Sequence, residues 1–100
     1  MIRATTNRET VLRELRGLKP QFEQLYGVTK IGVFGSVARG EVQAHSDVDV
    51  VVEMPPDLMK RARLKAELES LFRRDVDVVR YWRGMNRFLK KRIDDEALYV

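Results

Sequence analysis

The sequence predicts an α/β fold, in which a small mixed sheet of at least three strands has helices packed against it. Two observations lead to this fold. Segments with apolar residues at helical spacing alternate with short, valine-rich runs, in the order α-β-α-β-α-β-α. The polar segment between the first two strands is short for a parallel crossover, so the sheet should combine antiparallel and parallel pairs. A chain of 100 residues has room for one domain, residues 1–100.

The helices are predicted from their apolar stripes and from their ends. Thr6-x-x-Glu9 has the pattern of a capping box, Gly27 is a suitable stop, and Pro20 should kink or split the helix between them. After Pro55-Pro56, Asp57 should cap a second long helix. The stripes expected in the core are Val11, Leu12, Leu15, Leu18, Phe22 and Leu25, then Leu64, Leu68, Leu71 and Phe72, and finally Met85, Phe88, Leu89 and Ile93.

Three segments are predicted as strands, at 30–34, 47–53 and within 74–80, and a short helix should cover 36–40. In the second strand the side chains alternate, so Asp47 and Asp49 share one face and Val48, Val50 and Val52 share the other. The apolar end, residues 97–100, should pack back onto the domain or onto another protein.

The composition of the chain limits the kinds of protein that it could be. A hydrophobic content of 44% with 34% charged residues indicates a soluble globular chain, and the lack of cysteine excludes disulfides and thiolate metal sites. The start of the chain lacks the apolar core of a signal peptide and no apolar run approaches the ~20 residues of a membrane span, so we expect a cytoplasmic protein. The net charge of +4 would attract nucleotide phosphates or an acidic protein, but is too small to predict nucleic-acid binding.

Asp47 and Asp49 are the first sign of chemistry. Aspartate is a poor strand former, yet two stand side by side at the start of a strand, roughly 7 Å apart. The two carboxylates repel unless a cation lies between them, and Mg²⁺ prefers such oxygen ligands together with substrate phosphates. A lone Asp-x-Asp pair more often has no catalytic role.

Gly35-Ser36 follows the first strand and gives the aspartates their context. Glycine lets the backbone approach a phosphate, and the next amides, at a helix start, favour an anion. A lone Gly-Ser is usually only a turn. The order strand, Gly-Ser, helix, strand gives more support to a role in phosphate binding than the pair does alone. Arg39 either supports this loop, with Glu41 as an ion-pair partner, or reaches the phosphates.

Gly35-Ser36, ten intervening residues and Asp47-x-Asp49 together resemble the signature of the polymerase-beta-like nucleotidyltransferases. The longer run FGSVARGEVQAHSDVDVVV is similar to the minimal nucleotidyltransferases (MNT) of prokaryotes, which are about this small, so the resemblance covers nearly the whole chain. It implies one nucleotidyltransferase domain that uses ATP and two Mg²⁺ ions. Asp47 and Asp49 would hold metal, and Gly35, Ser36 and Arg39 would lie beside the nucleotide.

The resemblance also implies a third metal-binding carboxylate on the strand after the second long helix. Asp77, in the setting Val-Asp-Val-Val, fits better than Asp75, which lies at the helix–strand junction. Asp77 is also the candidate for helping to deprotonate the attacking hydroxyl. Taken alone, it could be an edge-strand charge that prevents aggregation.

The acceptor of the nucleotide is expected on another protein, because the chain has no room for a substrate domain. In the family, minimal nucleotidyltransferases pair with a small helical HEPN toxin and act as antitoxins by adenylylating a tyrosine on it, which implies a hetero-oligomer here. Two alternatives stay open. The chain could be a catalytically silent module that neutralises its partner by occlusion, or a transferase acting on a small molecule such as an aminoglycoside.

Three further residues are of uncertain role from sequence alone. Tyr81 and Trp82 could stack on a base or dock a partner, and core packing is at least as consistent with their position. His45 lies in a polar loop, where a single histidine is most often merely solvated.

Overall fold

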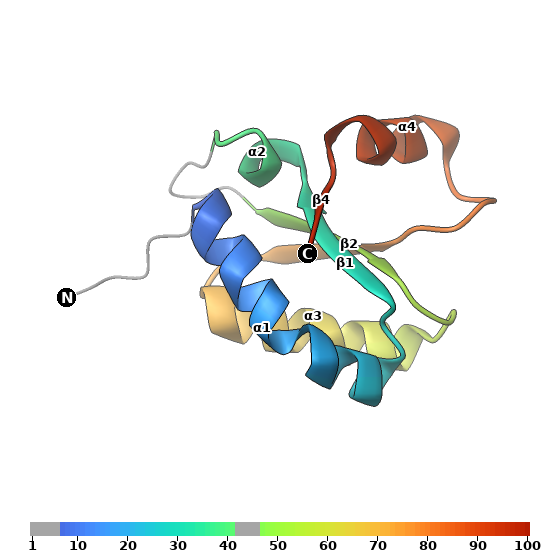
Figure 1. Cartoon of the computed structure of the whole chain (residues 1–100). Helices are drawn as coiled ribbons and strands as arrows, with labels where there is room; N and C mark the ends of the chain where they lie inside the picture. The colour runs from blue at the N-terminus through green and yellow to red at the C-terminus, as the bar shows by residue number, and fades with distance from the viewer. Residues whose placement is uncertain (1–6, 42–46) are drawn as a thin grey trace.

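The computed structural model describes residues 7–41 and 47–100. Its elements are α1 (Arg8–Tyr26), β1 (Lys30–Phe34), α2 (Gly35–Ala38), β2 (Val48–Glu53), α3 (Leu58–Phe72), β3 (Val76–Arg80), α4 (Arg87–Glu96) and β4 (Leu98–Tyr99) (Figure 1). The predicted order of helices and strands is therefore confirmed, and a short terminal strand is added to it. Across the described ranges, no helix has the length and apolar character needed to cross a membrane.

The sheet is mixed, as predicted, with the strand order β3-β2-β1-β4. β1 runs antiparallel to β2 and to β4, whereas β2 and β3 are parallel. The short segment between β1 and β2 thus joins antiparallel neighbours, and the longer helix α3 makes the parallel crossover. The apolar end packs back onto the domain, because the Val100 amide donates to the Ile31 carbonyl oxygen at 3.0 Å beyond the β4 pairing.

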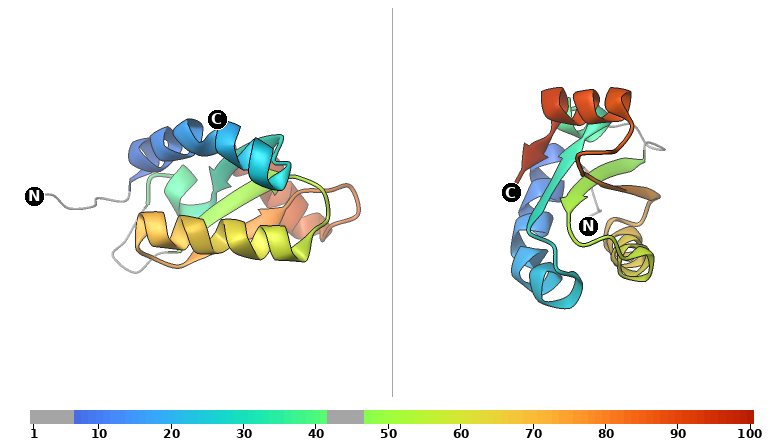
Figure 2. Two further views of the ribbon diagram at one scale, coloured as in Figure 1. Left: turned by 90° about the horizontal axis from the view of Figure 1, so that it is seen from below. Right: turned by 90° about the vertical axis from the view of Figure 1, so that its right-hand side faces the viewer.

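Helices cover both faces of the sheet (Figure 2). α1 and α3 lie against one face and bury the alternate residues Val48, Val50 and Val52 of β2. α4 lies on the other face, where Ile93 packs with Phe34 and Val51. Complete burial of such apolar side chains stabilises the fold by roughly 1.5–3 kcal/mol each, so β2 is held from both sides.

Helix α1 differs from the prediction at its start. Asn7 is the N-cap, and its side chain accepts a hydrogen bond from the Thr10 amide at 2.8 Å. The capping-box prediction was therefore wrong, because the helix begins one residue later than that pattern requires; Thr6 itself lies outside the described residues. Gly27 ends the helix as predicted, with φ 73°, and the helix continues through Pro20 without being split.

Other helix ends show smaller corrections. Asp57 caps α3 as expected, accepting a hydrogen bond from the Lys60 amide at 3.0 Å. Leu25, Leu71 and Phe88 were expected in the core, but they are 50%, 40% and 78% exposed. The helix sides that face the sheet are instead those of Phe22 in α1, of Leu68 in α3 and of Ile93 in α4. The short helix α2 begins at Gly35 and ends at Ala38, ahead of the predicted 36–40.

Gly32 is where β4 comes closest to β1. A Cβ atom added there would lie 2.3 Å from the Leu98 carbonyl oxygen, a distance that the two backbones cannot accept without moving apart. The absence of a side chain at this position therefore allows the terminal strand to dock.

We expect Gly32→Ala to lower the free energy of unfolding by about 1–3 kcal/mol, the usual cost of overpacking. The measurement is the thermal midpoint together with hydrogen exchange at the Val100 amide, which should speed up as β4 detaches. Gly17→Ala is the control: nothing lies within 4 Å of that position in α1, so alanine should stabilise by about 0.5–1 kcal/mol. Equal effects at both positions would contradict the close approach of β4.

Candidate functional site

Acidic side chains gather where β2 and β3 begin. The parallel register sets Asp49 directly beside Asp77, on strands that neighbour each other at about 4.8 Å. Asp47 immediately precedes β2, two residues before Asp49. Because side chains alternate along a strand, these aspartates share the face on which Val51 and Val79 pack against α4.

Asp75 behaves differently from Asp77. It precedes β3, and its carbonyl oxygen accepts a hydrogen bond from the Val48 amide at 3.0 Å, which extends the ladder between the two strands. The parallel register of β2 and β3 pairs Asp77, and not Asp75, with Asp49. The role of Asp77 as the third carboxylate of a metal site stays a prediction.

Asp49 is the electrostatic centre of this group. Burial, and next the Asp77 carboxylate, raise the pKa of Asp49, with a smaller contribution from Asp47. The guanidinium groups of Arg92 and Arg39 act in the opposite direction. Negative charge at Asp49 is therefore disfavoured in the folded chain, and a cation placed beside it would relieve that cost.

The three aspartates do not close around a common point. Within residues 7–41 and 47–100, no group of three acidic or histidine side chains is drawn together closely enough to hold a metal ion. Asp47 and Asp77 are exposed and Asp49 is half-buried, so the group forms an open acidic edge. Coordination of one ion by all three residues stays a prediction.

Gly35 brings the bend after β1 against Asp49. Phe34 is the register partner of Asp49, and the chain turns at Gly35 with φ 70°. A Cβ atom at Gly35 would lie 2.3 Å from Asp49 Oδ2, so both the left-handed backbone and the close approach require glycine. Ser36, the next residue, is half-buried and its hydroxyl donates to no other group of the described chain.

Arg39 supports the loop after α2. Its Nε donates to Glu41 Oε1 at 3.0 Å, the ion pair expected from sequence, and its Nη1 donates to Glu96 Oε1 at 3.1 Å. Its charge also reaches Asp49. Contact between Arg39 and a phosphate stays a prediction.

Two residues of α4 belong to this site and were not expected from sequence. Glu96 accepts a hydrogen bond from the Gly35 amide at 3.0 Å, and Arg92 lies with its guanidinium carbon 5.7 Å from the centroid of the Phe34 ring. Their spacing of four puts both on one side of the helix, next to the buried Ile93. The sequence shows the spacing of these two residues, but only the packing of α4 shows which side of the helix contacts α2.

The aromatic pair after β3 lies away from the aspartates. Tyr81 packs with the Phe34 cluster and donates a hydrogen bond to Asp94 at 2.7 Å. Trp82 is 49% exposed, with the Arg80 guanidinium over its ring. Asp77 is four residues before Tyr81 in the chain, roughly 13 Å along a strand. Stacking of either ring on a base stays a prediction. His45 and Ser46 lie outside the described residues.

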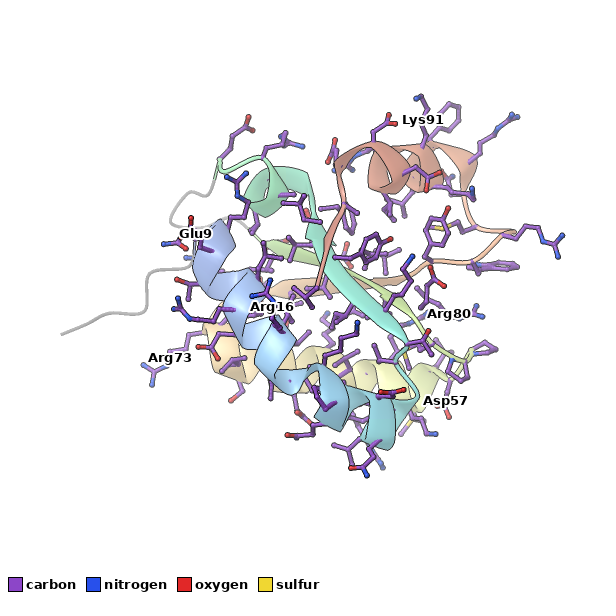
Figure 3. The ribbon with its side chains drawn as sticks, viewed as in Figure 1. Glu9, Arg16, Asp57, Arg73, Arg80 and Lys91 are labelled. Atoms are coloured by element: carbon purple, nitrogen blue, oxygen red, sulfur yellow. The ribbon has the colours of Figure 1, made fainter. Side chains whose placement is uncertain are left out.

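A pocket of about 330 Å³ opens at the opposite end of the sheet. It is lined by Gly27, Thr29, Glu53, Met54, Pro55, Arg80 and Tyr81. Figure 3 shows Arg80 there, far from α2, together with Asp57 at the start of α3. The acidic edge is thus separate from this hollow.

Comparison with known proteins identifies one family, both from a family model and from a related protein. The sequence model described as the nucleotidyltransferase domain matches residues 15–100. A protein adenylyltransferase, MntA, of Thermococcus cleftensis is 37% identical over 84 residues, which cover 82% of this chain and 84% of that protein.

Two solved structures have a similar fold. One, assigned as a minimal nucleotidyltransferase, has a TM-score of 0.78 and 32% identity, and the match covers 96% of this chain and 98% of the other. A toxin–antitoxin structure with AMP-PNP has a TM-score of 0.67 and 25% identity, over 94% of this chain and 72% of its own.

The raised pKa of Asp49 has a measurable consequence for stability. A carboxyl whose pKa is higher in the folded than in the unfolded chain stabilises the fold in acid, and that contribution is lost as the pH rises through the folded pKa. We therefore expect Asp49→Asn, measured without divalent cations, to raise the thermal midpoint at pH 7. The gain should vanish near pH ~3, below the ordinary aspartate pKa, where Asp49 is protonated in both states. A lower midpoint for the variant at pH 7 would contradict this account.

Proposed function

This chain belongs to the nucleotidyltransferase domain family, and we propose that it transfers AMP from ATP to a hydroxyl on a partner protein. One observation carries the proposal: Asp49 and Asp77 stand in register beside the Gly35 bend. This arrangement offers a place for cations next to a place for phosphates. The matched relative named protein adenylyltransferase points to the same chemistry.

The donor set fits a hard divalent cation. Asp47, Asp49 and Asp77 supply only carboxylate oxygens, and burial and Asp77 already disfavour the charge on Asp49. Mg²⁺ is commonly bound by one or two carboxylates plus substrate phosphates, so an open edge is a suitable half-site. When bound, two such ions would neutralise the phosphates and stabilise the entering and leaving oxygens.

The residues of the chain then divide the remaining tasks. The Ser36 hydroxyl and the backbone after Gly35 bind the outer phosphates, with Arg39 close by. The attacking hydroxyl oxygen forms a bond to the α-phosphorus while the bond to the β-phosphate oxygen breaks and pyrophosphate leaves. Asp77, exposed at the edge of the sheet, accepts the hydroxyl proton. Most of the rate enhancement comes from positioning and charge.

The partner we propose is a HEPN toxin, with a tyrosine as acceptor and this chain as its antitoxin. One similar structure is a toxin–antitoxin with AMP-PNP, and another is the toxin–antitoxin MntA-HpeT, which supports a toxin as the partner. The acidic edge is open rather than enclosed, as a site that acts on a folded protein must be. Exposed Trp82 and Phe88 provide apolar surface for association, at 49% and 78% exposure.

Neutralisation by occlusion alone is the rival hypothesis. Occlusion would use the apolar terminus and the basic helices as the contact surface. Leu98 and Tyr99 form β4 and are each 38% exposed, so part of the apolar terminus is already used within the domain. Modification of a small molecule is the other rival, and would appear as transfer without any protein partner.

The direct test is to incubate this chain with ATP, Mg²⁺ and the product of the neighbouring gene. Mass spectrometry then shows whether AMP has been added to that product. We expect Asp47→Asn and Asp49→Asn to reduce transfer about 10²-fold or more, since each removes charge from the metal site. Asp77→Asn should slow transfer more than nucleotide binding, and Asp75→Asn is the matched control that should do little. Protection from the toxin by an Asp47→Asn, Asp49→Asn double variant, with no mass added by the wild type, would favour occlusion. A damaging Asp75→Asn change would mean that the third carboxylate is misassigned.

Ser36→Ala tests the phosphate contact separately. Loss of a hydrogen bond to a charged group costs about 1.5–3 kcal/mol, so KM for ATP should rise roughly ten- to hundredfold. The thermal midpoint without nucleotide should change little, because the Ser36 hydroxyl donates to no group of the described chain. A large loss of thermal stability with unchanged nucleotide use would refute the assignment.

A further inference from the structure

We propose that Glu96 is a positioning residue for nucleotidyl transfer, holding the Gly35 bend and the Arg39 guanidinium in place for the triphosphate. This inference rests on the proposed function and extends it to α4, an element that carries none of the motif residues. Glu96 acts through Gly35 and Arg39 and touches no reacting atom.

A single oxygen of Glu96 makes all of these contacts. Oε1 accepts from the Gly35 amide at 3.0 Å and from Arg39 Nη1 at 3.1 Å, and Arg92 Nη2 lies 3.9 Å away. The Glu96 side chain is only 24% exposed, whereas that of its neighbour Asp95 is 61% exposed and pairs with Lys91 on the outer side of α4. Figure 3 shows Lys91 pointing away from the sheet. The two adjacent carboxylates therefore have different surroundings.

The fold holds Glu96 at this point from both sides. Glu96 is the last residue of α4, and the Ala97 amide closes the helix by donating to the Ile93 carbonyl oxygen at 2.9 Å. Two residues later the chain pairs with β1, and β1 leads directly into Gly35. The corner between α4 and β4 is thus fastened to the corner between β1 and α2.

This contact has a consequence for the phosphate site. The Gly35 amide is buried and needs an acceptor, which Glu96 provides. The Ser36 hydroxyl, one residue later, has no partner in the part of the chain that the structure describes. Fixing the bend at Gly35 therefore orients Ser36 before any ligand binds, and preorganisation of that kind lowers the cost of binding.

The opposite role for Glu96 is competition with the nucleotide. A carboxylate that accepts from a backbone amide and an arginine resembles a bound phosphate, so Glu96 would then occupy the phosphate site. The two roles predict opposite changes in KM when the carboxylate is removed. We favour positioning because Glu96 leaves the Ser36 hydroxyl unoccupied.

The experiment compares Glu96→Ala, Glu96→Gln and the control Asp95→Ala in the transfer assay with the partner protein. For Glu96→Ala we expect KM for ATP to rise about tenfold or more, with a smaller change in kcat. Glutamine keeps an oxygen acceptor for the Gly35 amide, so Glu96→Gln should recover most of that loss, and Asp95→Ala should resemble the wild type. A KM that is unchanged or lower in Glu96→Ala, or equal losses in the alanine and glutamine variants, would overturn the proposal.

Hydrogen exchange at the Gly35 amide gives a second readout that needs no activity. In Glu96→Ala this amide should exchange at least about tenfold faster, while the Ile31–Phe34 amides of β1 keep their protection. Loss of protection throughout β1 would show a general structural role and would overturn positioning. A wild-type chain that transfers nothing to any partner would refute the proposed function, whereas wild-type transfer with an unaltered KM in Glu96→Ala would refute only the role of Glu96.

Discussion

The parallel pairing of β2 with β3 is the constraint on which the rest of the structure depends. It places Asp49 beside Asp77 on adjacent strands, where two carboxylates repel each other and burial adds to the cost. Apolar packing on both faces of β2 is what tolerates this arrangement, since Val48, Val50, Val51 and Val52 are all fully buried. Burial of its valines therefore stabilises β2, while the Asp49 carboxylate lies near the start of that strand.

A second set of contacts ties the chain's terminal segment to the same end of the sheet. β4 pairs with β1 through the space that Gly32 leaves, and α4 brings Glu96 to the Gly35 amide and Arg92 near Asp49. The basic and acidic groups around Asp49 therefore come from α2, α4, β2 and β3 together. Such an arrangement matches the needs of a reaction that depends on charge and position more than on covalent chemistry.

The location of the site also bears on the substrate. The acidic edge is open, and the pocket of about 330 Å³ lies at the other end of the sheet. An enclosed small-molecule site usually buries most of its ligand, which an open edge does not do. An open edge leaves room for the protein acceptor that we propose.

The sequence by itself determined the order of elements, the mixed sheet and the motif from Gly35 to Asp49, because local periodicity and turn residues carry that information. It also favoured Asp77 over Asp75 as a third carboxylate, which stays a prediction, and the register sets Asp77 beside Asp49. The capping box was wrong, because the Asn7 side chain caps α1 one residue later, and Pro20 does not split the helix. Core positions for Leu25, Leu71 and Phe88 were also wrong, since packing decides which side of a helix is buried. Only the tertiary structure decided the pairing of β4 and the contact of Glu96 with Gly35, because these join residues 61 or more positions apart, for which sequence spacing carries no signal.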